Sequence, residues 1–145
     1  MFKRLLTSHT ILENWLFLVR VFTGILIAIY GFEIFDANKM AGNVAWLTDL
    51  HFPAPHFMAC LGKAAELTGG ILVTLGLLVR PVSIVLVLDM FVITFIMGQG
   101  KILGDAQLPF LFLLLFVSFI FTGGGKWSLD YFLFDRVRKK DKSLF

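Results

Sequence analysis

The chain has 145 residues, of which 58% are hydrophobic and only 16% are charged, and its mean hydropathy is +0.86. These values lie outside the balance typical of soluble domains, so the composition predicts an integral membrane protein. The formal net charge of +3 is small. Membrane topology explains it better than binding of the basic tail to anionic lipid headgroups does, and nucleic acid binding is not suggested. A single cysteine, Cys60, excludes an internal disulfide, a CxxC redox centre and a cysteine-rich metal site.

Four apolar segments are long enough to cross a bilayer as helices, for which roughly 20 residues are needed. We predict spans over residues 15–35, 57–79, 81–98 and 106–124. The fourth has no charge between Asp105 and Lys126 and is the clearest. The sequence therefore predicts an all-α fold, a polytopic four-helix membrane bundle that forms a single domain over residues 1–145.

The first span carries a charge at each end. A stripe of residues with helical spacing includes small side chains that let helices approach closely, and it consists of Arg20, Gly24, Ala28 and Gly31. We expect Arg20 to face the bundle, where its planar donors would bind a carboxylate or a ligand oxygen. Glu33 lies at the outer end, where we expect it to be solvated.

A polar loop follows the first span, and it contains apolar residues with helical spacing: Met40, Val44, Leu47 and Leu50. It predicts a short amphipathic helix that lies on the bundle. His51 and His56 are two histidines without a third ligand of matching spacing, so no metal site is predicted. We retain His51 as a candidate for a polar contact with a ligand.

The second span also has a periodic stripe, formed by Gly62, Glu66, Gly69, Val73 and Gly76. These residues share one helical face, so Glu66 is expected to face another helix while the glycines serve packing. Lys63 lies three residues before Glu66, which predicts an ion pair on the helix surface.

The third span has Asp89 near its middle. An ionisable group in hydrocarbon costs several kcal/mol unless it meets a partner or water, and such groups are functional candidates. We therefore select Glu66 and Asp89 as candidate catalytic residues, and Arg20, Lys63, Glu66, Asp89 and His51 as candidate ligand contacts. We expect Arg20, Glu66 and Asp89 to point inward, but the depths of Arg20 and Glu66 argue against their direct pairing. The alternative is that these charges form purely structural ion pairs.

The positive charges predict the orientation of the chain. Nine lysines and arginines fall on the side of the two termini, including the basic tail 126–145, and two, Lys39 and Lys101, fall on the other. The positive-inside rule then places both termini in the cytoplasm. The segment TGGGKWS lacks the spacing of a phosphate loop and follows a membrane helix, so no nucleotide site is predicted.

Three segments together resemble the DoxX family of small membrane proteins. They are ELTGGILVTLGLLVR from Glu66 to Arg80, GGGKWSLD from Gly123 to Asp130, and the pair Arg20 and Gly24. The resemblance implies a four-helix bundle in the bacterial cytoplasmic (inner) membrane. Some members of the family are subunits of a thiosulfate:quinone oxidoreductase, and others are linked to oxidative-stress complexes or to catechol and quinone resistance.

Two functions from different classes are the main candidates, and transport of a small solute through the polar interior is a third, less favoured alternative. The first is a quinone-facing or accessory subunit of a membrane oxidoreductase, with a quinone as the expected cofactor and no nucleotide or metal. The second is a non-enzymatic structural or assembly subunit of a larger membrane complex. Both imply contact with membrane lipids and with a protein partner or further copies of the chain, and neither implies nucleic acid. The sequence leaves open whether the chain is catalytic alone.

Overall fold

The computed structural model describes residues 9–135, with side chains from residue 15 to residue 133. Within this range the chain is helical and contains no strand. The five longer helices are α2 (His9–Gly31), α3 (Ala37–Asp49), α4 (Pro55–Leu75), α5 (Val79–Phe91) and α6 (Gln107–Thr122). The shorter segments are a 3-10 helix, η1 (Phe32–Phe35), and two π-helices, η2 (Val92–Met97) and η3 (Tyr131–Asp135). The predicted all-α class is confirmed; the basic tail lies largely outside the described residues.

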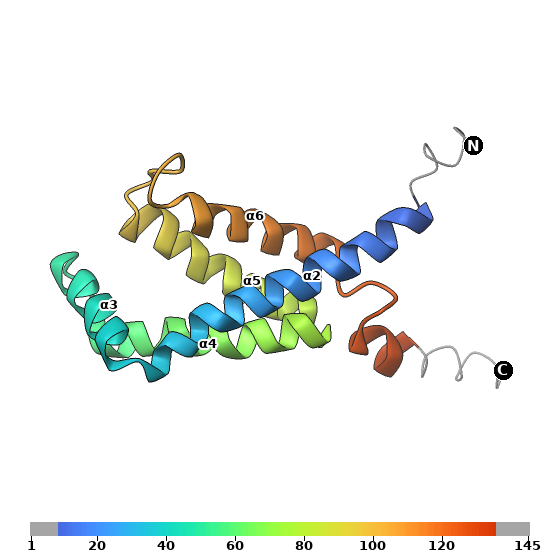
Figure 1. The fold of residues 1–145 in the computed structure, drawn as a ribbon, viewed down its shortest axis with the longest axis horizontal. Helices are drawn as coiled ribbons and strands as arrows, with labels where there is room; N and C mark the ends of the chain where they lie inside the picture. The colour runs from blue at the N-terminus through green and yellow to red at the C-terminus, as the bar shows by residue number, and fades with distance from the viewer. Residues whose placement is uncertain (1–8, 136–145) are drawn as a thin grey trace.

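The four apolar helices form a bundle in which α2 packs along α4 and α5 packs along α6 (Figure 1). Helix α3 lies across one end of this bundle, and η3 lies at the opposite end (Figure 1). We call these the α3 end and the terminal end. The short helix predicted between the first two spans is therefore confirmed as α3, and its apolar residues Met40 and Leu47 are buried.

Within the described residues, three helical stretches are long and apolar enough to cross a membrane. They are Trp15–Phe35, from α2 and η1, Pro55–Leu75, which is α4, and Val79–Met97, which combines α5 and η2. Helix α6 is apolar but has 16 residues, which gives a length of about 24 Å against a hydrocarbon thickness of roughly 30 Å. It is shorter than the predicted span 106–124 because Gly123, at φ 68°, ends it after Thr122.

The connection between α4 and α5 is also tighter than the sequence predicts. Helix α4 ends at Leu75 rather than Val79, because Gly76 (φ 72°) adopts the left-handed conformation that often follows a helix. Leu78 is left-handed as well, and Val79 already begins α5. Pro81 falls in the first turn of α5, where a missing N–H costs no helical hydrogen bond.

Glycines allow α2 and α4 to approach until their backbones touch. A Cβ on Gly70 would lie 2.5 Å from the backbone nitrogen of Ala28, and a Cβ on Gly31 would overlap the backbone of Leu67. On the adjoining face of α4, Gly69 packs against Leu86 of α5. The stripes on α2 and α4 therefore face neighbouring helices, as residues that pack helices in lipid do.

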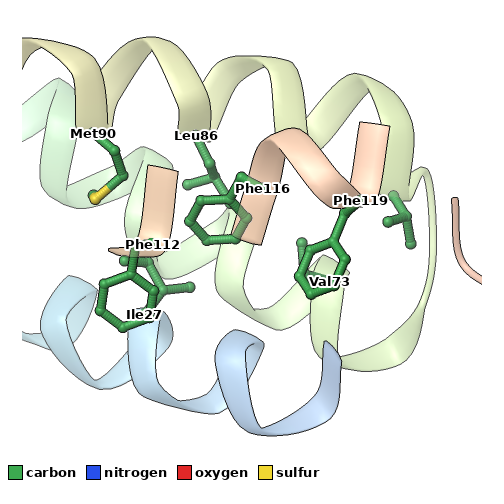
Figure 2. Packing of buried hydrophobic residues seen from close by; sticks show 8 residues of the cluster. Ile27, Val73, Leu86, Met90, Phe112, Phe116 and Phe119 are labelled. Atoms are coloured by element: carbon green, nitrogen blue, oxygen red, sulfur yellow. The ribbon is translucent and has the colours of Figure 1, made fainter. Parts of the chain in front are cut away.

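The apolar core lies between all four helices and is dominated by aromatic side chains from α6. Figure 2 shows Phe112, Phe116 and Phe119 directed toward the other helices, and all three are buried. The core is completed by Ile27 from α2, Val73 from α4, and Val79, Leu86 and Met90 from α5. The outer faces of the helices expose many large apolar side chains, as is expected of a surface that contacts lipid.

Candidate functional site

A cavity of about 450 Å³ lies toward the α3 end of the bundle, lined by residues of α2, α3, α4, α5, η2 and α6. Most of its wall is apolar, and its ionisable lining residues are Tyr30, Lys63, Glu66 and Asp89. Leu61 of α4 and Leu88 of α5 line the cavity and are exposed on the outer surface. The cavity therefore has an apolar rim at the surface that faces lipid.

Lys63 is the centre of an ion-pair network in the wall of this cavity. Its Nζ lies 2.9 Å from Glu66 Oε2 within α4 and 3.1 Å from Glu33 Oε2 in η1. Glu33 uses its other oxygen, Oε1, to accept a hydrogen bond of 2.9 Å from Lys39 Nζ in α3. Ammonium and carboxylate groups thus alternate along a row from α3 to the cavity, in the order Lys39, Glu33, Lys63 and Glu66. Such pairing reduces the cost of charge at membrane depth.

Glu33 is a site residue that the sequence analysis did not identify. It lies at the end of the first span, where solvation was expected, but the turn η1 directs it back toward Lys63. The hydrogen bond from Lys39 to Glu33 and the negative charge of Glu33 raise the pKa of Lys39 above its usual value. Lys39 lies outside the spans, so this end of the network is cationic at neutral pH.

Asp89 faces the same cavity from α5. Its Oδ1 would lie 3.0 Å from a Cβ on Gly62, so the absence of a side chain at Gly62 leaves room for the carboxylate. Its Oδ2 is buried and has no hydrogen-bond partner among residues 15–133. A buried polar oxygen without a partner costs about 1–3 kcal/mol, so a ligand that bonded it would recover that cost.

Asn43 of α3 is a second site residue that the sequence analysis missed, and unlike Glu33 it lines the cavity. Its Nδ2 is buried and, within the described part of the chain, makes no hydrogen bond. Asn43 lies three residues after Met40 and four before Leu47, both buried, so its place on the inner face of the helix was visible from the spacing. The cavity therefore offers an amide from α3 as well as charges from α4 and α5.

Arg20 is buried but lies at the terminal end, away from the cavity. Its guanidinium donates to the backbone carbonyls of Gly124 and Trp127, after α6. It also packs against Gly76, where a Cβ would lie 2.8 Å from its Cζ. The structure therefore brings Lys63, Glu66 and Asp89 together, and it places Arg20 in a separate contact with the chain that follows α6.

Asp130 strengthens this second contact. Its carboxylate accepts hydrogen bonds from the backbone nitrogens of Leu78 (2.7 Å) and Val79 (3.0 Å), at the start of α5. These are bonds that cap a helix N-terminus. Ser128 Oγ accepts from the nitrogen of Tyr131 and caps the final turn. We call Arg20, Gly76, Ser128 and Asp130 the terminal clamp.

His51 is exposed and does not line the cavity, although Phe52 beside it does. Its backbone has a φ of 56°. Across residues 9–135, no group of three or more His, Cys, Asp and Glu side chains is arranged to hold a metal ion. The candidate site is therefore the cavity near the α3 end. It offers a ligand two carboxylates, one ammonium group and one amide beside an apolar space.

Comparison with known proteins agrees with this architecture. No solved structure matches the chain significantly. The chain is 32% identical over 118 residues to a protein of Bacillus subtilis (strain 168) named "Putative oxidoreductase CatD", and the alignment covers 81% of this chain and 85% of that protein. The DoxX family model matches residues 15–99, which include most of α2, all of α3 to α5 and the whole charged network. The chain is therefore a membrane protein of the DoxX family.

Proposed function

We propose that this chain is a quinone-binding membrane subunit associated with an oxidoreductase. The observation that carries the proposal is the cavity itself, in which an apolar space of about 450 Å³ meets a wall bearing Lys63, Glu66 and Asp89. Ligand sites in proteins combine a mostly apolar pocket with a few polar groups that orient the ligand. The name of the Bacillus relative, an oxidoreductase, is consistent with this assignment.

The residues present are suited to a quinone head group. A quinone carries carbonyl oxygens that accept hydrogen bonds, and Lys63 and Asn43 supply N–H donors from two different helices. The reduced quinol carries hydroxyls that donate, and the free Oδ2 of Asp89 can accept. Glu66 and Asp89 are also groups that can hold or release a proton. We assign the transfer of electrons to a partner oxidoreductase that this chain contacts in the membrane.

The ligand would enter from the bilayer. Leu61 and Leu88 belong both to the cavity wall and to the outer surface, so a lipid-soluble molecule can reach the cavity without crossing the aqueous phase. We further propose a location in the bacterial cytoplasmic membrane, with both termini in the cytoplasm and the α3 end outside. The greater number of lysines and arginines on the side of the termini supports this orientation.

Extraction of bound lipids from the purified protein tests the proposal. We expect about one quinone per chain from the wild type, and much less from Glu66→Gln and Asp89→Asn, which remove the charges but keep side-chain size. Asp105→Asn is the matched control because Asp105 is exposed and does not line the cavity. A wild type that carries no quinone, but that copurifies with an obligate protein partner, would instead favour a structural or assembly subunit.

A further inference from the structure

A row of ionisable groups with decreasing exposure runs from the surface at the α3 end to the cavity wall. The exposed fraction of the side chain falls from 56% for Lys39 to 21% for Glu33, 14% for Lys63 and 3% for Glu66. Each neighbouring pair in the row is within hydrogen-bond distance, at 2.9, 3.1 and 2.9 Å. The row therefore begins at the α3 end, where water has access, and ends at a buried residue that lines the cavity.

We propose that Glu33, Lys63 and Glu66 form a proton relay between the water at the α3 end and the ligand in the cavity. This inference rests on the proposed function, because the ligand is the group that takes up or releases the proton. It adds a route and a direction: protons exchange with the α3 side of the membrane and not with the terminal side.

The geometry allows each transfer to be written out. Lys63 gives an Nζ proton to Glu66 Oε2 across 2.9 Å, which breaks an N–H bond and forms an O–H bond. The neutral amine then takes a proton across 3.1 Å from Glu33 Oε2, once Glu33 has been protonated from water. Glu66 passes its proton to a ligand oxygen in the cavity. Each of the three relay residues thus returns to its starting protonation state, and one proton moves from water to the ligand. Release from a hydroxyl of the ligand runs through the same atoms in reverse.

The other charged groups near the cavity, within residues 15–133, do not form a second row of contacts with it. Asp89 faces the same cavity from α5, beside Gly62, and would be the acceptor or donor on the far side of the ligand. Arg20 of α2 is also buried, but its guanidinium donates to backbone carbonyls at the terminal end of the bundle. Lys39 binds Oε1 of Glu33 through its ammonium group and Asp36 through its backbone nitrogen, and it does not reach Lys63 or Glu66. Glu33 is thus the single carboxylate that links Lys63 to water among the described ion pairs.

A quinone that reports its own protonation tests the relay. A 2-hydroxy-3-alkyl-1,4-naphthoquinone changes colour when its hydroxyl ionises, and the bound probe can be followed by stopped-flow absorbance after a pH jump with the protein in nanodiscs. We expect Glu33→Gln to slow protonation of the bound probe by about a hundredfold or more, the order of effect of removing one proton-transfer group. Asp49→Asn should leave the rate unchanged, because Asp49 is an exposed carboxylate at the same end that takes no part in the row.

A second measurement uses the wild type alone. In proteoliposomes of uniform orientation, a pH jump on the α3 side should reach the bound probe faster than a jump on the terminal side. Equal rates from both sides, or a Glu33→Gln protein that responds as fast as the wild type, would overturn the relay while leaving quinone binding intact. If the probe does not bind the wild type at all, the proposed function fails and the relay fails with it.

Discussion

An ion pair between Lys63 of α4 and Glu33 of η1 links the cavity wall to the end of the first span, with Lys63 Nζ 3.1 Å from Glu33 Oε2. Because Lys63 also pairs with Glu66 at 2.9 Å, one ammonium group neutralises carboxylates from two elements. This arrangement makes the charged wall of the cavity a single electrostatic unit. The loss of one member is therefore expected to affect the others.

Lys63→Met should be strongly destabilising because it leaves Glu66 buried without its cation. Removing one member of a buried pair typically costs about 3–5 kcal/mol, whereas replacing both members with apolar residues is often nearly neutral. We therefore expect a large drop in the unfolding midpoint for Lys63→Met and a midpoint near that of the wild type for Lys63→Met with Glu66→Leu. Thermal unfolding in detergent checks this. A double variant less stable than Lys63→Met would contradict the interpretation.

Gly70→Ala should weaken the contact between α2 and α4. The added Cβ would lie 2.5 Å from the backbone of Ala28, and overpacking of this kind costs about 1–3 kcal/mol. Gly42→Ala is the matched control, since a Cβ there meets nothing within 4 Å and alanine favours the helix. Unfolding midpoints of the two variants should move in opposite directions. Equal shifts would mean that the close approach of the helices is unimportant.

Arg20→Met should destabilise the terminal clamp without affecting the cavity. Two hydrogen bonds from a buried guanidinium are lost, and hydrogen bonds to charged groups contribute about 1.5–3 kcal/mol each. We expect a lower unfolding midpoint and faster proteolysis between Gly123 and Ser128, while the folded fraction retains its quinone. Loss of quinone from protein that remains folded would place Arg20 in the ligand site instead.

Asn43→Leu should weaken quinone binding by about fivefold, the equivalent of one net hydrogen bond of about 1 kcal/mol. Asn43 lines the cavity with a buried, unpartnered amide nitrogen. Asn38→Leu is the control because Asn38 is exposed on the same helix and does not line the cavity. Affinities measured by titration in detergent would separate the two. Equal affinities for both variants would show that α3 supplies no ligand contact.

Much of the fold follows from the sequence because lipid imposes a strong constraint. Apolar length located the helices, and helical spacing identified α3 and the ion pair of Lys63 with Glu66. Helix ends were less predictable. Helix α5 begins at Val79, two residues before the predicted span, because Leu78 takes a left-handed conformation. Leucine rarely adopts this conformation, so the sequence did not indicate a turn at this position.

The partners of the charged residues were harder to predict than their burial. Arg20 binds backbone carbonyls of Gly124 and Trp127, and since every residue has a carbonyl, no pattern marks these two. Glu33 was expected to be solvated because it lies at the end of a span, but its direction depends on the turn η1. Long-range pairs of this kind depend on tertiary packing rather than on local spacing.

Quenching of Trp46 fluorescence is the most direct test of the central claim that the cavity binds a quinone. Trp46 lines the cavity, and Trp15→Phe with Trp127→Phe would leave it as the single tryptophan of the chain. Titration with a short-chain quinone should give saturable quenching that Asp89→Asn weakens, while a variant that keeps only Trp15 shows weak, unsaturable quenching. Equal, unsaturable quenching of Trp46 and Trp15 would contradict a quinone site in this cavity.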